Sequence, residues 1–314
     1  MLRSDTPKLT SIDPSIASLF QPPGGDIEVS FEFFPPKTDQ MEQNLWRAIQ
    51  RLKNYGPRFV SVTYGAGGTT RERTHRTVSR ILEETQLKPA AHLTCVGASK
   101  SDVDQVVEDY WAAGVRHIVA LRGDPAQGDD VFTPHPQGYT SSVDLISSIR
   151  KTHEFEISVG CYPEKHPEAR DMDADIDYLK RKIDAGATQA ISQFFFQADM
   201  FFRFLDKARA AGITVPILPG ILPVTNFKQL KRFAAGCGAS VPEWMARLFE
   251  GLDEEPETRN LVAAALAAEQ CRRLYAGGVR DFHFYTLNRA DLTYGLCHIL
   301  GKRAEVAETR ASAA

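Results

Sequence analysis

The sequence predicts an α/β fold, a single-domain (β/α)8 TIM barrel in which helices surround a closed parallel sheet. Short β-branched or aromatic runs alternate with longer segments of helical period, and this alternation is typical of a parallel sheet. Eight such runs occur, separated by segments long enough for right-handed crossovers. The 314 residues also suit one such barrel, which commonly takes about 250 residues.

The predicted strands follow a lead-in rich in Pro and Gly. They span residues 28–34, 59–64, 90–96, 117–122, 156–162, 188–195, 214–218 and 280–285. The predicted helices begin near Asp39, Arg71, Ser101, Ser141, Asp171, Ala198, Asn226 and Pro256. We expect Thr38 or Asp39, and Ser101, to cap two of these helices, because their side-chain oxygens can accept hydrogen bonds from free amides at a helix N-terminus.

The remaining segments lie outside this alternation. Residues 1–26 form the lead-in, residues 27–302 the barrel, and residues 303–314, rich in Ala and Glu, a frayed tail. An insertion over residues 240–255 precedes the eighth helix, and residues 291–300 form a closing helix after the last strand.

Composition and charge exclude several protein classes. The chain is 43% hydrophobic and 25% charged with a net charge of -3, so neither disorder nor nucleic-acid binding is expected. Five scattered cysteines form no C-x-x-C pair, which predicts no disulfide framework or zinc site and fits the cytoplasm. The N-terminus lacks an apolar signal segment. The longest uncharged stretch, residues 210–227, holds three prolines, so we expect no membrane span.

Side-chain alternation along the strands predicts a polar barrel interior. In the first strand Phe31 and Phe33 share one face and Glu32 shares the other with Ser30, because successive side chains point to opposite faces. The same split occurs in other strands, where the polar members are Ser61, Thr63, His92, Thr94, Ser158 and Tyr162. This polar set is expected to line the barrel axis toward the carboxyl ends of the strands, where barrel enzymes place their chemistry. Alternatively, these are ordinary hydrogen-bonded interior residues.

Glu32 is the sharpest single candidate for catalysis. It lies within Phe-Glu-Phe-Phe-Pro-Pro at residues 31–36, an apolar context that is expected to remove water from the carboxylate and raise its pKa toward neutrality. Such a carboxylic acid can donate a proton near pH 7. The alternative is a buried glutamate paired with an arginine or a hydroxyl for structural reasons.

A second carboxylate follows the fourth strand in Arg122-Gly123-Asp124. Gly123 lets the backbone approach a ligand, and Asp124 is expected to project over the barrel mouth, where two acids in different environments could share proton transfer. The alternative for Asp124 is a simple turn former.

Two further motifs concern ligand binding. Residues 65–70, Gly-Ala-Gly-Gly-Thr-Thr, look like a weak phosphate cradle, but they lack the lysine of a P-loop and the G-x-G-x-x-G spacing of a dinucleotide fold. The eight histidines show no H-x-H or H-E-x-x-H pattern, so no metal is expected.

Side chains on the sixth strand and the fifth helix could also contact a ligand. Gln193 offers an amide donor and acceptor to the edge of a heterocycle. Asp175 and Lys182 lie two turns apart on one helix face, where they could hold a sugar and a phosphate or form solvated surface charge.

Together these segments resemble the catalytic barrel of the 5,10-methylenetetrahydrofolate reductases, in the short bacterial-type form. The resemblance covers residues 28–300. It rests on residues 31–36 (FEFFPP), 59–65 (FVSVTYG), 91–95 (AHLTC), 117–124 (HIVALRGD), 162–168 (YPEKHPE) and 281–289 (DFHFYTLNR).

The resemblance implies a role for each matching residue. Glu32 would be the acid that activates folate, and Asp124 would lie near the flavin and the pterin. The positions that would hold FAD are Thr63, His92, Arg122, Gly123, Asp124, Tyr139, Tyr162, His166, Asp175 and Lys182. Besides Glu32 and Asp124, the positions that would contact folate or nicotinamide are Gln193, Phe233, Tyr285 and Arg289.

The resemblance also implies a reaction. NADH or NADPH would reduce FAD, and 5,10-methylenetetrahydrofolate would then be reduced to 5-methyltetrahydrofolate in the same pocket by a ping-pong mechanism that feeds methionine synthesis. A cytoplasmic homo-oligomer is expected. The alternatives are a flavin-free pterin-binding barrel methyltransferase, which also needs an acid and stacking rings, and a non-catalytic scaffold.

Overall fold

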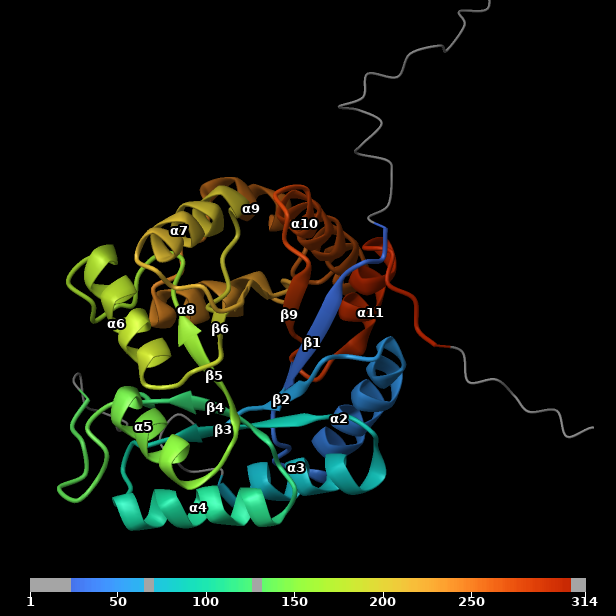
Figure 1. The fold of residues 1–314 in the computed structure, drawn as a ribbon. Helices are drawn as coiled ribbons and strands as arrows, with labels where there is room; N and C mark the ends of the chain where they lie inside the picture. The colour runs from blue at the N-terminus through green and yellow to red at the C-terminus, as the bar shows by residue number, and fades with distance from the viewer. Residues whose placement is uncertain (1–23, 65–70, 126–131, 306–314) are drawn as a thin grey trace, which may run out of the picture.

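A computed structural model describes residues 24–64, 71–125 and 132–305 and has one parallel sheet (Figure 1). Its order is β7-β6-β5-β4-β3-β2-β1-β9-β8. The strands are β1 (Glu28–Phe33), β2 (Val60–Val62), β3 (Pro89–Thr94), β4 (His117–Leu121), β5 (Glu156–Cys161), β6 (Gln189–Ser192), β7 (Ile217–Leu218), β8 (Gly220–Ile221) and β9 (Asp281–Tyr285). The predicted barrel and its strand order are confirmed.

The barrel closes through β7 and β8, which are two halves of one strand separated by Pro219. β7 pairs with β6 and β8 pairs with β9, so the two ends of the sheet meet within one chain segment. Proline has no N–H for the ladder, but its carbonyl still accepts a hydrogen bond from the His283 amide at 3.1 Å. The predicted strand 214–218 is therefore displaced toward Ile221, beyond the proline.

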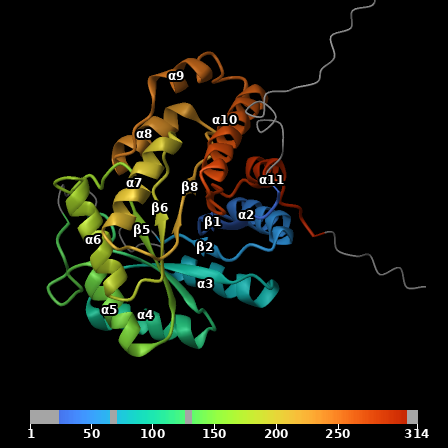
Figure 2. The ribbon, with the colours of Figure 1, turned by 45° about the horizontal axis from the view of Figure 1, so that its top comes forward.

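Helices surround the sheet, as two views of the ribbon show (Figures 1 and 2). They are α2 (Asp39–Leu52), α3 (Arg71–Glu84), α4 (Lys100–Ala112), α5 (Ser142–Thr152), α6 (Met172–Asp184), α7 (Ala198–Ala210), α8 (Phe227–Cys237), α9 (Glu243–Phe249), α10 (Pro256–Ala276) and α11 (Ala290–Ile299), and a 3-10 turn, η1 (Lys53–Tyr55), follows α2. Helix α9 occupies the predicted insertion, and α11 is the closing helix.

The predicted caps are right for α2 and wrong for α4. The Thr38 hydroxyl accepts from the Met41 amide at 3.2 Å and caps α2. Helix α4 begins two residues earlier than expected, with Ser99 in place of Ser101 as its cap. Ser99 and Asp102 form a reciprocal capping box that satisfies amides at both positions, which Ser101 could not do from inside the first turn.

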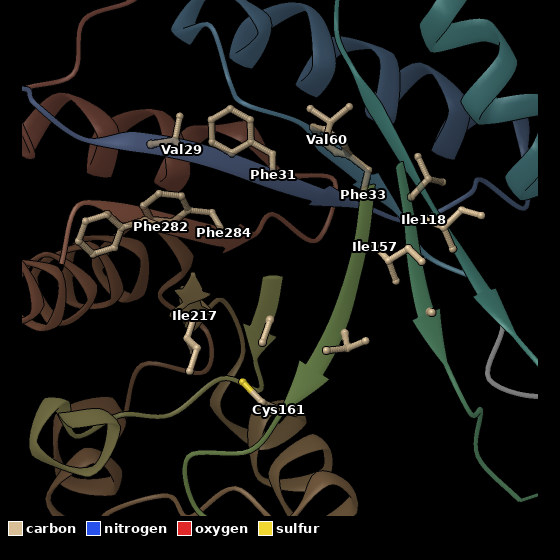
Figure 3. Packing of buried hydrophobic residues seen from close by; sticks show 14 of the residues in the cluster. Val29, Phe31, Phe33, Val60, Ile118, Ile157, Cys161, Ile217, Phe282 and Phe284 are labelled. Atoms are coloured by element: carbon tan, nitrogen blue, oxygen red, sulfur yellow. The ribbon is translucent and has the colours of Figure 1, made fainter. Parts of the chain in front are cut away.

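Alternation on β1 separates the helix-facing core from the barrel interior. Phe31 and Phe33 are fully buried and belong to the core packed against the helices. The ring of Phe31 lies 6.3 Å from that of Phe284 on β9, and Figure 3 shows both rings among the packed side chains. This arrangement leaves Ser30 and Glu32 on the inner face, as predicted.

The floor of the barrel interior is a buried layer of polar and aromatic side chains. The Ser30 hydroxyl lies 2.8 Å from His283 Nδ1, and the Ser158 hydroxyl lies 2.7 Å from His117 Nε2. The Phe59 ring packs against both imidazoles, 4.6 Å from His117 and 5.7 Å from His283. These side chains fill the floor, and a cavity opens toward the carboxyl ends of the strands.

The lead-in and the expected tail are described only in part. Residues 1–23 of the lead-in and residues 306–314 of the expected tail lie outside the described residues. The first part of that tail still contacts the barrel, because the Glu305 amide donates to the Asn54 carbonyl at 2.7 Å and Ala304 packs against the core. None of the helices in the described ranges is long and apolar enough to span a membrane.

Candidate active site

A cavity of about 410 Å³ opens at the carboxyl ends of the strands. Its size falls within the range of about 300–1,000 Å³ that small-molecule sites occupy. It is lined by most of the predicted site residues, namely Glu32, Thr63, His92, Arg122, Gly123, Asp124, Tyr162, His166, Gln193, Phe233 and Tyr285. The structure therefore brings together side chains that the sequence scatters over two hundred positions.

The two sides of this cavity differ in chemistry. Charged and polar groups follow β4 and β5, where Arg122, Asp124, Tyr162 and His166 lie. Apolar groups gather where β8, β9 and β1 end, and they include Leu222, Leu287 and Phe34. A ligand that fills this cavity is expected to be polar or charged at one end and apolar at the other.

A second cavity of about 250 Å³ continues from the polar side. The two cavities share Arg122, Gly160, Tyr162 and His166, and the second is closed by Asp175 and Lys182 of α6. The predicted shared face of these two α6 residues is thus confirmed, and Lys182 is not surface charge, because it is only 7% exposed. The two cavities therefore adjoin at these shared residues, and a buried cation lines the second one.

Lys182 is fixed by β5, and Asp175 is fixed by the loop that follows β5. The Lys182 ammonium donates to the Gly160 carbonyl at 2.5 Å, and burial lowers its pKa. The Asp175 carboxylate accepts from the His166 amide at 2.8 Å and so ties α6 to that loop. A buried ammonium that faces a cavity is a binding group for an anion such as phosphate.

Arg122 is held by a carboxylate within the structure. Its guanidinium makes two hydrogen bonds of 2.6 Å to Glu168, the bidentate geometry that also suits a phosphate. The backbone turns at Gly123, whose φ of 92° favours glycine, and this turn places Asp124 on the cavity wall.

Glu32 lies at the bottom of the main cavity, where its carboxylate faces two imidazoles. Its Oε2 is 3.4 Å from His92 Nε2 and 3.7 Å from His283 Nε2, and the Ser61 hydroxyl donates to the same oxygen at 3.4 Å. Burial alone would raise the pKa of Glu32. The interactions of its carboxylate with the His283 and His92 imidazoles outweigh this effect and lower the pKa to about 2.

The expectation of a raised Glu32 pKa is therefore wrong. The phenylalanines next to Glu32 in sequence point to the opposite face of β1, so they do not surround its carboxylate. The groups that do surround it come from β2, β3 and β9. His283 could have been anticipated from the sequence, because its position in the last strand alternates with Phe282 and Phe284.

Gln193 and Tyr285 line the cavity beside Glu32. The Gln193 side-chain oxygen accepts a hydrogen bond from the Phe194 amide at 3.0 Å, and this bond orients the side-chain amide. The NH2 group of the same amide can then donate to a ligand in the cavity. The Tyr285 hydroxyl donates to the Ser192 carbonyl at 2.7 Å, next to Gly220. A Cβ on Gly220 would lie 2.8 Å from this hydroxyl, so the glycine makes room for the tyrosine.

Tyr139 and Arg289 are not brought to either cavity. Tyr139 is 5% exposed, and its hydroxyl bonds Asp104 at 2.5 Å and Ser148 at 2.6 Å between α4 and α5. Arg289 is exposed at the N-cap of α11. The Gly-rich segment 65–70 lies outside the described residues. Among those residues, no group of three or more His, Cys, Asp or Glu side chains could hold a metal ion.

The comparison with known proteins decides the family. The family model described as methylenetetrahydrofolate reductase matches residues 19–301, which include every cavity-lining residue named above. The chain belongs to the methylenetetrahydrofolate reductase family. It is thus an oxidoreductase, and the resemblance seen in its motifs is confirmed.

Individual relatives of this reductase family support the assignment. The chain is 52% identical over 284 residues to a 5,10-methylenetetrahydrofolate reductase from Pectobacterium carotovorum, covering 90% of this chain and 93% of the relative. It is 51% identical over 279 residues to the Escherichia coli protein of the same name, covering 89% and 92%. Against methylenetetrahydrofolate reductase (NADH) 1 of Arabidopsis thaliana the identity is 35%, covering 88% of this chain and 49% of the relative.

Among solved structures, a Clostridium thermocellum protein described as binding two copies of 5-methyl-5,6,7,8-tetrahydrofolic acid has a similar fold. The TM-score is 0.59 with 15% identity, covering 91% of this chain and 96% of the other. At that identity the similarity concerns the fold of the reductase alone.

Proposed function

We propose that this chain reduces 5,10-methylenetetrahydrofolate to 5-methyltetrahydrofolate with electrons from NADH or NADPH, using FAD in a ping-pong mechanism. The observation that carries the proposal is a pair of adjoining cavities, one lined by the carboxylate of Glu32 and the other by the buried ammonium of Lys182, in a chain of this family. The product would supply methyl groups to methionine synthesis.

The residues present fit FAD. The Thr94 hydroxyl lines the main cavity, is buried and has no hydrogen-bond partner among the described residues, as a group that meets a ligand would. Lys182 and Arg122 would hold the anionic part of the cofactor, with Asp175 beside its sugar and His92 and Thr63 beside its ring. When bound, FAD would accept hydride from the nicotinamide and deliver it to folate.

One cavity would serve both substrates in turn. The main cavity, of about 410 Å³, opens at the carboxyl ends of the strands, and the nicotinamide and the folate would occupy the same part of it beside the cofactor ring. Successive occupancy by the two substrates is what a ping-pong mechanism requires.

Glu32 would donate the proton that opens the five-membered ring of the folate. The leaving nitrogen must gain a proton before the exocyclic carbon can become an iminium cation. Glu32 is ionised at neutral pH, so it would first take up a proton from solvent as a ring system covers the carboxylate and raises its pKa by desolvation, and it would then pass that proton to the leaving nitrogen. Its side chain is 12% exposed before that step.

Asp124 and Gln193 would position and stabilise the folate. Asp124, an exposed carboxylate on the cavity wall, would stabilise the positive charge that develops on the iminium. The Gln193 amide would bond the edge of the pterin.

The variant Glu32→Gln tests this assignment by separating the two half-reactions. Flavin reduction by NAD(P)H, followed by stopped-flow absorbance, should stay within about threefold of wild type, whereas reoxidation by methylenetetrahydrofolate should slow by about 10² to 10⁴, the usual contribution of a general acid. Glu28→Gln, at the exposed opposite end of β1, is the matched control. Equal losses in both half-reactions would contradict the role of Glu32.

The flavin itself separates the proposal from a flavin-free methyltransferase. The purified protein should be yellow, with flavin absorbance bands that bleach on addition of NADH or NADPH. A colourless protein that binds no added FAD would favour the methyltransferase. Size-exclusion chromatography with light scattering would test the expected homo-oligomer.

A further inference from the structure

Phe34 is a large apolar side chain left partly in the open beside the active site. It follows the two fully buried phenylalanines of β1, yet it is 37% exposed and lines the main cavity. Phe233 of α8, on the same cavity, is 48% exposed. An exposed aromatic ring at the edge of a ligand cavity commonly marks a surface that a ligand covers.

The backbone of Phe34 is held by a side chain from the opposite end of the chain. The Asn288 side-chain oxygen accepts from the Phe34 amide at 2.9 Å, and the Asn288 NH2 group donates to the Phe34 carbonyl at 3.0 Å. These two bonds continue the contact between β1 and the segment after β9 as far as Phe34, two residues beyond the last paired residues Glu32 and Tyr285. A single amide thus fixes both backbone groups of Phe34.

The segment that carries Asn288 has an uncommon backbone. Leu287 and Asn288 both lie in the left-handed region, with φ of 52° and 55°. Asparagine tolerates this conformation, whereas leucine does so at a cost. Thr286, just before them, donates its hydroxyl to the Glu32 carbonyl at 2.6 Å and accepts from the Asn288 amide at 3.1 Å. Strained residues are retained where the surrounding contacts dictate the geometry, which is frequent at functional sites.

We propose that Phe34 contacts the aryl part of the folate substrate, and that Asn288 is a positioning residue that holds Phe34 at the cavity edge for this contact. The inference deepens the proposed function and rests on it. The geometry favours the aryl part because Phe34, Leu287 and Leu222 form the apolar side of the cavity, away from the charged side that suits the cofactor. Beyond its pterin, a folate carries a benzene ring that needs such a surface.

The contact is expected to act on binding more than on chemistry. An aromatic pair contributes about 3- to 10-fold in affinity beyond the area that it buries. Phe34→Leu keeps an apolar side chain and removes the ring, and it should raise the Kd of 5-methyltetrahydrofolate and the KM of methylenetetrahydrofolate by about that factor. Flavin reduction by NAD(P)H should stay within about twofold, and kcat should change less than KM.

Asn288→Gly isolates the amide from the backbone strain, since glycine adopts the left-handed conformation freely. It should raise the same Kd and KM by a similar factor. If Asn288 acts through Phe34, the double variant should bind folate no more weakly than Phe34→Leu alone, because the two changes then remove one interaction. Asn44→Ala on the exposed face of α2 is the control for loss of an amide.

The measurement is calorimetric titration of each flavin-loaded variant with 5-methyltetrahydrofolate, alongside stopped-flow kinetics and thermal unfolding. A raised Kd with an unchanged Tm and non-additive changes supports the inference. Unchanged Kd in Phe34→Leu, multiplying effects in the double variant, or a wild type that binds no folate would overturn it. If the wild-type protein binds 5-methyltetrahydrofolate but NAD(P)H does not reduce its bound flavin, the proposed reductase activity is refuted. In that case the Kd values of the variants still decide the role of Phe34.

Discussion

Replacing Lys182 by methionine tests whether the second cavity holds the anionic part of the cofactor. Lys182 is 7% exposed, and its ammonium donates a hydrogen bond to the Gly160 carbonyl at 2.5 Å. Burial lowers its pKa, so the fold carries a cost for keeping the ammonium charged. Methionine has nearly the same length and volume and no charge, so the substitution removes the cation without opening a large void.

The expected changes in binding and stability differ in size. A hydrogen bond to a charged group contributes about 1.5–3 kcal/mol, which corresponds to a rise of about 10- to 150-fold in the Kd of FAD. In the flavin-free protein the lost bond to Gly160 and the relief of the buried charge oppose each other, so Tm should change by no more than about 2 °C.

The pH dependence of stability gives a second check on Lys182. Its pKa is lower in the folded protein than the ordinary 10.5, so the cost of its burial is present at neutral pH and falls as pH rises through the folded pKa toward 10.5. Wild type should therefore gain stability relative to Lys182→Met over that range, measured by urea unfolding.

The binding assay is fluorescence titration of flavin-free protein with FAD. Lys180→Met on the same helix is the matched control, because the Lys180 ammonium pairs with Asp184 and lines neither cavity. An unchanged Kd in Lys182→Met would refute the anion site. A drop in Tm of many degrees together with weaker binding would show that Lys182 serves the fold instead.

Three further predictions follow from single contacts. The stability contributed by the Glu32 carboxylate is present above pH 4.5 and is lost as pH falls toward its folded pKa of about 2. Glu32→Gln should therefore remove this part of the acid dependence of the free energy of unfolding, at most about 3 kcal/mol, as measured by urea unfolding at a series of pH values. Gly220→Ala should destabilise the protein by about 1–3 kcal/mol or prevent folding, because the new Cβ would lie 2.2 Å from the Ser192 carbonyl oxygen; unchanged thermal stability would contradict the closure geometry. Tyr139→Phe should lower the free energy of unfolding by about 1–2 kcal/mol, because it loses the hydrogen bonds to Asp104 and Ser148, and should leave the Kd of FAD unchanged. A higher Kd of FAD in this variant would show that Tyr139 contributes to flavin binding.

Strand alternation is what made the inner face of the barrel predictable. A two-residue period requires Ser30 and Glu32 to face away from Phe31 and Phe33, and the structure has this arrangement. The electrostatics of Glu32 depend on the same alternation, because Phe31 and Phe33 are its neighbours in sequence but not the neighbours of its carboxylate in space. In a strand these two sets differ, which is why the expected pKa had the wrong direction.

Local sequence also could not show what each polar group meets across the barrel. Tyr139 occupies a loop position that the resemblance placed at the flavin, yet its hydroxyl is satisfied by α4 and α5. Phe34 has the apolar context of a core residue, but the end of β1 carries it to the cavity edge, where Asn288 fixes it. Both outcomes depend on contacts between segments that are far apart in the chain.

The sequence by itself determined the order of strands and helices, the inward set of polar side chains and the family, because these follow from periodicity and from motifs that are contiguous in the chain. Only the tertiary structure decided that the barrel closes across Pro219, that His92 and His283 lower the pKa of Glu32, and that Lys182 is a buried group lining the second cavity. Strand pairing at Pro219, the pKa of Glu32 and the burial of Lys182 all depend on which groups are close in space. Closure of the sheet brings together groups that are far apart in the sequence.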